Sequence, residues 1–330
     1  MGRIAYIFQR MRRMDYRAMW RTAGMLRKKT GRSTLWLLLD MVRCALVYGA
    51  GYVDYKIAEM YRLTPAQRET VITRAMSNRI VARMNDKAYW HHFDDKAQFN
   101  ALFAQQVRRG WLDLREATPE VFAEWAKGRG DVIGKPMEGS SGNGIVKYEQ
   151  GKLPPLEEIR GAGIGLLEDC VPQHETLSAL CPTSVNTLRI ATMLGDKKEG
   201  VVYAYLRIGN GNVVDNVDQG GMAAPVDLES GALCGVGADK QGNRYATHPM
   251  TGVAIPGLQI PYWQEAVEMC LQSMRVVPQV RFVAWDVAIT PDGPAFIEGN
   301  SFPSHAVPQF AAHYPDGIGI LPRVREFIEC

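Results

Sequence analysis

The sequence lacks most of the short patterns by which catalytic and metal-binding sites are commonly recognised. Its 330 residues include six cysteines and six histidines, but no CxxC pair, no zinc-type spacing and no HExxH. These absences exclude the common zinc sites, and the scattered cysteines predict reduced thiols in a cytosolic protein. The chain also shows no Ser-His-Asp arrangement and no cysteine placed as a nucleophile, so no pattern indicates nucleophilic catalysis.

Long apolar runs are missing as well. The most apolar stretch, residues 35–52, is interrupted by Asp40 and Arg43 and falls far short of the roughly 20 residues of a membrane span. We therefore expect a helix that lies on the protein or on a membrane surface. No apolar region and cleavage site follow the basic start, so we expect no signal peptide. Tyr6 stands where N-myristoylation requires Ser or Thr. The prediction is a cytoplasmic protein, either free or associated with a membrane surface.

Net charge is low, at +3, but it is unevenly distributed. Residues 1–32 hold ten lysines and arginines against one acid, Asp15, a balance of +9 that leaves −6 for the rest of the chain. A nucleic-acid binder more often carries its positive charge on the folded body, so we expect no nucleic-acid partner. Residues 4–29 predict an amphipathic helix. Either residues 1–32 contact anionic lipid headgroups, or the apolar face of this helix packs on the protein. The oligomeric state stays open.

Helical patterns come first along the chain and strand patterns later. Residues 54–85 predict helix, with Thr64 as an N-terminal cap, and further helices are expected to start at Asp94 and Thr118. From residue 131 short β-rich runs appear, joined by hairpin-type turns, and helix-linked parallel strands are not evident. We therefore predict an α+β fold behind a helical N-terminal region. The expected segments are residues 1–50, 51–125, 126–182 and 183–330; the expected strands are 132–135, 145–148, 165–168, 187–194 and 201–208, and residues 261–274 return to helix.

Two carboxylates and an amide stand in two short apolar segments, residues 280–290 and 294–300, on either side of Pro291-Asp292-Gly293. This tripeptide is a strong turn signal, so we predict a hairpin in which it forms the loop and Thr290 pairs with Pro294. Counting outward places Asp286 directly opposite Glu298, with Cβ atoms about 4.5–5.5 Å apart, and Asn300 on the same face. The residues expected on the opposite face, in a core, are Val283, Trp285, Val287 and Ile289.

This hairpin has two interpretations. Two carboxylates held so close repel each other unless a cation lies between them. Together with an amide oxygen they suit Mg²⁺, which proteins usually bind jointly with nucleotide phosphates. Alternatively, the hairpin is exposed and its acids are solvated and unpaired.

A glycine-rich segment, residues 131–147, is the second candidate for nucleotide binding. Lys135 ends a predicted strand, and a loop with glycines and serines leads to the next strand. Glycines let backbone N–H groups approach phosphate oxygens, the serines can donate as well, and the lysine supplies positive charge. The pattern is neither a Walker A loop nor a Rossmann fingerprint. The alternative is an ordinary surface turn. The loop residues are Gly139, Ser140, Ser141, Gly142, Asn143 and Gly144.

The segment 166–175 carries acids at the end of a predicted strand and beyond it. The backbone of such a junction can bind an adenine edge, and a downstream carboxylate, Glu175 or the competing Asp169, can bind ribose hydroxyls. Alternatively, the segment is a domain boundary with solvated acids. Cys170, between these acids, is interpreted as a packing residue.

Taken in this order, the elements resemble the ATP-grasp superfamily. The matching residues are Asp95-Lys96, Lys135-Pro136 with its glycine loop, Glu168-Asp169-Cys170-Val171, and Asp286 with Glu298-Gly299-Asn300. More narrowly, residues 186–190, Asp215-Asn216 and Gly220-Gly221 resemble the sugar-transfer-associated ATP-grasp group. The resemblance extends over roughly residues 50–330 and leaves residues 1–32 outside it.

The resemblance implies an ATP-grasp fold, in which two α+β subdomains, residues 126–182 and 183–330, clamp ATP. It places Lys96 and Lys135 at the phosphates and the loop 139–144 over the β- and γ-phosphates. Glu168 and Val171 are expected at the adenine, and Glu175 or Asp169 at the ribose. The residues expected to hold one or two Mg²⁺ ions are Asp286, Glu298 and Asn300, and Arg189 is expected to stabilise the transferred phosphoryl group.

An acceptor pocket is expected just past the metal residues. It would contain Ser301, Phe302, Ser304 and His305. His305 either deprotonates an incoming ammonium, binds substrate or caps a turn. Arg207 and Arg281 are candidate anchors for a substrate carboxylate.

The implied activity is that of an ATP-dependent carboxylate–amine ligase. Phosphorylation turns a carboxylate into an acyl phosphate, which an amine attacks with release of phosphate, so positioning and charge neutralisation carry the reaction. We predict ATP and Mg²⁺ as cofactors, an amino acid and a sugar- or glycan-related compound as substrates, and Arg189, Lys135 and His305 as catalytic residues. One alternative is a phosphotransferase acting on a hydroxyl acceptor. Another is a nucleotide-gated scaffold in a membrane glycan complex, against which the presence of both lysines, both carboxylates and Arg189 argues.

Overall fold

The computed structural model of the chain describes residues 15–137, 144–211, 217 and 220–329. Contacts divide the chain into two units. Unit 1 comprises Met1–Ile80 and His305–Arg325, and unit 2 comprises Val81–Ser304 and Glu326–Cys330. The division into the four segments expected from the sequence stays a prediction.

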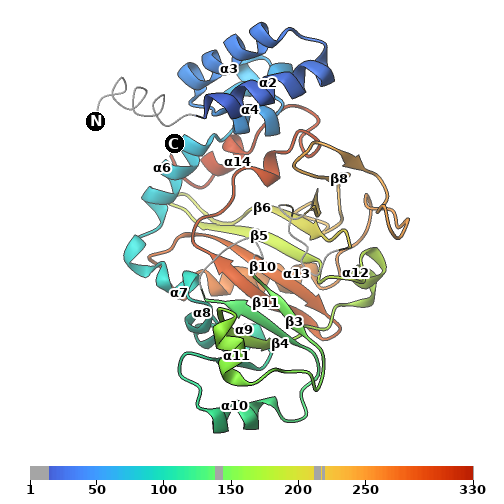
Figure 1. Ribbon diagram of the computed structural model, residues 1–330. Coiled ribbons are helices and arrows are strands. Elements are labelled where there is room, and N and C mark those ends of the chain that lie inside the picture. Colours follow the sequence, from blue (N-terminus) through green and yellow to red (C-terminus); the bar gives the residue numbers. More distant parts are fainter. Residues whose placement is uncertain (1–14, 138–143, 212–216, 218–219, 330) are drawn as a thin grey trace. The chain divides into compact units, whose positions relative to one another are not determined.

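Unit 1 is built from helices (Figure 1). Asp15 caps the first of them by accepting a hydrogen bond from Ala18 N, and Gly31, at a φ of 72°, ends it in the left-handed conformation. Ser33 and Gly49 bound the next helix in the same way. The described helices of unit 1 are α2 (Tyr16–Thr30), α3 (Thr34–Tyr48), α4 (Tyr52–Ile57), η1 (Met60–Arg62), α5 (Pro65–Arg68), α6 (Arg74–Met84, which ends in unit 2), η4 (Val307–Gln309) and α14 (Leu321–Arg325).

Two helix predictions need correction or limitation. The helix expected over residues 4–29 is observed from Tyr16 onward, and its earlier part lies outside the described residues. The helical region expected over residues 54–85 is broken into α4, α5 and α6. The reason is local, because Thr64 and Gln67 form a capping box that starts a new helix at Pro65. The cap at Thr64 and the helical character of the region are therefore confirmed.

The first half of unit 2 carries a four-stranded antiparallel sheet in the order β1-β4-β2-β3. Leu114, Val132 and Leu167 form a small core with Leu156 and Ile159. The predicted strands of this region are confirmed within two residues, whereas β1 was not predicted. The elements are η2 (Lys87–Tyr89), α7 (His91–Asp94), α8 (Lys96–Leu102), α9 (Ala104–Val107), β1 (Trp111–Asp113), α10 (Pro119–Ala126), β2 (Val132–Pro136), β3 (Val146–Tyr148), α11 (Leu156–Gly161) and β4 (Ile164–Asp169).

The second half of unit 2 carries a seven-stranded antiparallel sheet in the order β11-β10-β5-β6-β7-β8-β9 (Figure 1). One face of this sheet packs against α13 and against aromatic side chains of α7 and α8, with Trp285 fully buried between them. Its described elements are α12 (Glu175–Leu180), β5 (Thr187–Leu194), β6 (Glu199–Ile208), β7 (Met222–Pro225), β8 (Gly237–Ala238), β9 (Arg244–Tyr245), α13 (Trp263–Ser273), β10 (Phe282–Thr290) and β11 (Gly293–Asn300).

The hairpin β10–β11 has the predicted pairing of Asp286 with Glu298, but it reaches that pairing by another route. Thr290 pairs with Gly293, not with Pro294, so the connecting loop is one residue shorter than expected. A β-bulge between Asp286 and Val287 then adds one residue to β11 and restores the register. The four apolar residues expected in the core are all buried there.

Gly293 makes this short loop possible, since its φ of 113° is rarely adopted by other residues. We expect Gly293→Ala to lower the free energy of unfolding by about 1–3 kcal/mol, because of backbone strain. Urea denaturation followed by circular dichroism measures this. Gly130→Ala is the matched control, since a Cβ there meets nothing within 4 Å. Equal stability of the two variants would contradict the argument.

Candidate active site

Four neighbouring strands carry one line of polar side chains on the face opposite the core. Glu298 of β11 pairs with Asp286 of β10, Asp286 pairs with Arg189 of β5, and Arg189 pairs with Tyr205 of β6. Directly paired residues point to the same face of a sheet. The antiparallel order of strands therefore brings Arg189 and Asp286 together, although they lie 97 positions apart in the sequence.

Asp286 is the centre of this line and is completely buried. Arg189 donates to both of its carboxylate oxygens, with Nη2 2.8 Å from Oδ2, and Nη2 of Arg207 lies 2.9 Å from Oδ2. Burial alone would raise the pKa of Asp286, but the two guanidinium charges outweigh it and lower the pKa. Asp286 is therefore an ionised carboxylate shared by two cations.

The pKa of Glu298 is shifted in the direction opposite to that of Asp286. Burial and the charge of Asp286 raise its pKa, and Arg207, Arg189 and Lys135 only partly offset this. The side chains of Glu298 and Asp286 are hydrogen-bonded to each other. Glu298 is thus a carboxyl group that holds its proton more tightly than usual because of its burial and of the anion beside it.

The donor set of this hairpin fits a hard divalent cation. A cation between the two carboxylates would remove the repulsion that raises the pKa of Glu298. Asn300 lies opposite Ala284, whose carbonyl accepts a hydrogen bond from Asn300 Nδ2 over 3.3 Å. In the described part of the chain, no group of three or more His, Cys, Asp or Glu side chains is placed to hold a metal ion. Two carboxylates and one amide correspond to the way Mg²⁺ is held together with substrate phosphates.

A second cluster surrounds Glu168, the buried carboxylate of β4. Lys135 Nζ lies 2.5 Å from Oε2, Arg109 Nη2 lies 2.9 Å from Oε1, and Asn100 Nδ2 donates to Oε1 over 2.6 Å. Burial would raise the pKa of Glu168, but the charges of Lys135 and Arg109 outweigh it and hold the pKa well below its usual range. The Glu168 side chain is therefore fully engaged by protein groups, and its backbone lies in β4 between β1 and β2.

Arg109 was not predicted as a site residue, yet it connects the two sheets of unit 2. Besides Glu168 of β4, its guanidinium donates to the carbonyls of Phe296 and Ile297 in β11, the latter over 3.2 Å. Its side chain is almost fully buried. In the sequence it follows Arg108 directly, and an arginine pair next to a helix is normally read as solvated charge. Its contacts with Glu168, 59 residues away, and with the carbonyls of β11 show that it connects the two sheets.

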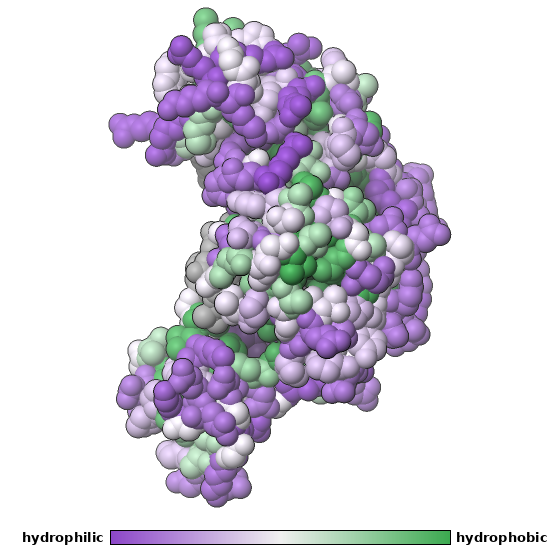
Figure 2. Space-filling model, turned by 90° about the vertical axis from the view of Figure 1, so that its right-hand side faces the viewer, coloured by the Kyte–Doolittle hydropathy of each residue, from purple (hydrophilic) through white to green (hydrophobic). Residues whose placement is uncertain are grey.

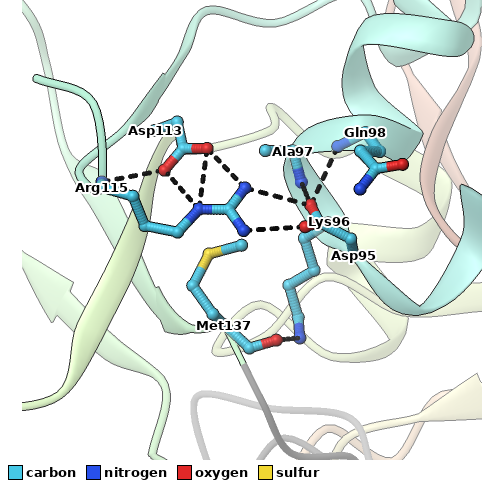
Figure 3. Close-up of polar contacts among 7 residues, drawn as sticks. All are labelled: Asp95, Lys96, Ala97, Gln98, Asp113, Arg115 and Met137. Atoms are coloured by element: carbon cyan, nitrogen blue, oxygen red, sulfur yellow. Dashed lines mark hydrogen bonds and ion pairs between the residues drawn. The ribbon is translucent and has the colours of Figure 1, made fainter. Parts of the chain in front are cut away.

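Lys96 lies at the start of α8, where Asp95 caps the helix by accepting from Ala97 N and Gln98 N at 3.0 Å each (Figure 3). Its Nζ approaches Met137 O at 3.4 Å, next to the beginning of the glycine loop. Burial lowers the pKa of Lys96, with Glu298 acting in the opposite direction and Lys135 in the same direction. The charges that act on this ammonium group thus come from both clusters, Glu298 from one and Lys135 from the other.

The remaining candidates for nucleotide binding are Asp169, Val171, Glu175 and the residues of the glycine loop. Asp169 is paired with Arg129, with 2.7 Å between Oδ1 and Nη1, and accepts from Gly110 N. Val171 is half-buried, and Glu175 is exposed at the start of α12. Gly144 takes a φ of 75° at the end of the glycine loop. The candidates outside the described residues are Gly139, Ser140, Ser141, Gly142 and Asn143, together with Asp215 and Asn216.

His305 belongs to unit 1, whereas the metal candidates belong to unit 2. Its Nε2 lies 3.0 Å from Asp54 Oδ1, and both side chains are buried. Of the expected acceptor-pocket residues, Ser301, Phe302 and Ser304 lie in unit 2. Arg281 is paired with Asp196 at 2.7 Å, away from Asp286, while Arg207 contacts Asp286 directly.

This combination of sheets, cation clusters and paired carboxylates is that of an ATP-grasp protein, a class whose enzymes use ATP and Mg²⁺. Residues 161–327, just over half of the chain, match the family model described as sugar-transfer associated ATP-grasp. The chain belongs to this family. The matched range contains Glu168, Arg189, Asp286, Glu298 and Asn300. No curated protein sequence matches the chain.

Several solved structures are similar to this chain. They include a D-alanine-D-alanine ligase from Coxiella burnetii, with 11% identity, 71% of this chain and 59% of that chain covered, and a TM-score of 0.39. The chain thus spans less than two thirds of that ligase. The ATP-grasp ligase PsnB complexed with a precursor variant, Mg and ADP has 14% identity, coverage of 79% and 68%, and a TM-score of 0.44. The D-cycloserine synthetase DcsG has 11% identity, coverage of 84% and 80%, and a TM-score of 0.43.

Proposed function

We propose that the protein is an ATP-dependent carboxylate–amine ligase that forms an acyl-phosphate intermediate. The observation that carries the proposal is the charged face of unit 2. There Arg189 and Arg207 pair with Asp286, which lies opposite Glu298 in a hairpin, and Lys135 pairs with Glu168. Glu298 also interacts electrostatically with Lys96 and Lys135. Such a face is suited to neutralising phosphate charge, which is what acyl-phosphate chemistry requires of the protein.

In the first proposed step, a carboxylate oxygen of the substrate attacks the γ-phosphorus of ATP and ADP leaves. Lys96 and Lys135 neutralise the phosphates, and Arg189 stabilises the transferred phosphoryl group. Asp286, Glu298 and Asn300 would hold Mg²⁺, which supplies positive charge to the phosphate oxygens. Glu175 is the better candidate for the ribose hydroxyls, because Asp169 is already paired with Arg129.

In the second step, the amine nitrogen attacks the carbonyl carbon of the acyl phosphate, and inorganic phosphate leaves with the former carboxylate oxygen. The amine loses its proton to a base, a role for which His305 stays a prediction. Arg207 is the favoured anchor for a substrate carboxylate, since it lies on the charged face. The proposed substrates are an amino acid and a sugar- or glycan-related compound.

An oxygen-label experiment tests this mechanism. The protein is incubated with ATP, Mg²⁺ and a panel of amines and ¹⁸O-carboxylates, including amino acids and sugar uronates, and products are analysed by mass spectrometry. A ligase that works through an acyl phosphate yields ADP, an amide and inorganic phosphate that carries one ¹⁸O atom. A phosphorylated hydroxyl acceptor with no label in free phosphate would instead establish the phosphotransferase alternative and overturn the proposal.

A further inference from the structure

Helix α3 in unit 1 has an apolar face that none of the described residues covers. Leu35, Leu39, Val42 and Leu46 are exposed by 67%, 62%, 42% and 48%. Their spacing of four, three and four residues places them on one side of the helix. Trp36 extends this side and carries the guanidinium of Arg32 over its ring at 4.0 Å. Single exposed apolar residues are common on proteins, but a continuous stripe indicates an interaction surface.

The opposite face of α3 packs in the core of unit 1. The exposed apolar stripe is therefore not a core face that has been turned outward. Leu37, Met41 and Cys44 are buried in the core of unit 1. Asp40, on the same buried face, accepts from Arg68 through both of its oxygens at 2.7 and 2.8 Å and from the Tyr55 hydroxyl at 2.8 Å. Rotating α3 to bury its outer face would break this buried ion pair. The exposure of the stripe therefore follows from how the helix is anchored.

The same two helices, α2 and α3, and the short segment between them also carry exposed basic residues. Residues 15–50 have one exposed acid, Asp15, since Asp40 is buried with Arg68. In Figure 2, hydrophilic residues cover most of the visible surface of unit 1. Two further large apolar side chains of α2, Trp20 and Met25, are exposed by 63% and 53%. The exposed basic residues in this range are Arg17, Arg21, Arg27, Lys28, Lys29, Arg32 and Arg43.

We propose that α2 and α3 dock unit 1 on the surface of an anionic lipid bilayer. Apolar side chains enter the boundary of headgroups and acyl chains, and the basic residues pair with anionic headgroups. The described part of the chain contains no helix with the length and apolarity of a membrane span. A second copy of this chain is a poorer occupant, because self-association would bring two sets of these cations together. The sequence indicated lipid contact for residues 1–32 and left residues 35–52 either on the protein or on a membrane surface, whereas this proposal assigns both α2 and α3 to the membrane surface.

Vesicle flotation of the full chain tests this inference independently of any enzymatic activity. We expect binding to phosphatidylcholine vesicles that contain roughly one third phosphatidylserine, and little binding to pure phosphatidylcholine. Leu39→Glu with Leu46→Glu should reduce the bound fraction at least tenfold. Arg21→Gln with Lys28→Gln should reduce it by about fivefold per charge removed.

The matched control is Val121→Glu with Val276→Glu, which alters two apolar residues of unit 2 that are exposed by 50% and 49%. This variant should bind as the wild type does, and circular dichroism should show all variants folded. Absence of binding to anionic vesicles, or equal binding by the α3 variant, would overturn the proposal. A wild-type dimer that Leu39→Glu with Leu46→Glu converts to a monomer, without vesicle binding, would assign the surface to a second copy instead.

Discussion

Asp286→Asn is expected to lower the free energy of unfolding by about 3–5 kcal/mol. The substitution keeps the shape of the side chain but removes a charge that Arg189 and Arg207 share at this buried position. Two guanidinium groups would then lose the buried carboxylate that both of them contact. Urea denaturation at neutral pH gives the change in stability directly.

The pH dependence of this loss has a defined sign. The folded protein holds the pKa of Asp286 below its ordinary value, so ionised Asp286 stabilises the fold at all pH values above the pKa of the unfolded chain, about 3.9. The advantage of the wild type over Asp286→Asn should therefore be constant at neutral pH. It should shrink only in acid, as the pH falls through the lowered pKa.

Asp196 provides a matched control, because it is also held by two arginines but is exposed. Its carboxylate lies 2.7 Å from both Arg83 and Arg281, and its side chain is 42% exposed. Asp196→Asn should cost much less, because its ion pairs are screened by solvent. Adding Arg207→Gln to Asp286→Asn should recover part of the loss, since it removes one of the two cations that the Asp286 carboxylate had neutralised. If Asp286→Asn and Asp196→Asn lowered the free energy of unfolding equally, the buried ion pairs of Asp286 with Arg189 and Arg207 would not have the stabilising role that we assign to them.

The pairing of Asp286 with Glu298 shows what local sequence patterns can predict and what they cannot. The turn signal at residues 291–293 and the alternation of apolar residues were sufficient to place the two acids opposite each other, as observed. The loop length was wrong and a bulge compensated for it. Bulges depend on how a strand fits its neighbours in the sheet, so local patterns do not reveal them. The agreement at Asp286 thus depended on two deviations that cancel.

Contacts between elements that lie far apart in the sequence could not be predicted from it. The fold class and most strands follow from local patterns and from the family resemblance, which the family match confirms. Arg109 and Asn100, by contrast, acquire their roles only because α8, the segment after α9 and β4 come together around Glu168. An arginine or asparagine in a helical region has no periodic signal that distinguishes such a residue from a solvated one.

Glu298→Gln is expected to separate stability from activity. It removes a carboxyl group whose pKa is raised by burial and by Asp286, while the amide can still donate a hydrogen bond to that carboxylate. A raised pKa means that the contribution of Glu298 to stability falls as the pH rises from the pKa of the unfolded chain, about 4.3, through the raised pKa of the folded protein. We therefore expect the variant to gain roughly 1 kcal/mol at pH 8, and to lose that gain as the pH falls and wild-type Glu298 becomes protonated.

The same substitution should abolish the effect of Mg²⁺. An uncharged amide cannot balance a divalent cation, so Mg²⁺ should no longer raise the affinity for ATP measured by calorimetry, and ADP release should fall by roughly a thousandfold. Glu59→Gln is the control, since Lys29 and Arg62 lower the pKa of that buried carboxyl in unit 1 against the effect of burial. It should destabilise the protein and leave the Mg²⁺ effect intact. If Mg²⁺ promoted ATP binding to Glu298→Gln as strongly as to the wild type, Glu298 would not be a ligand of the metal, and the hairpin would have to be read as an ion-pair network alone.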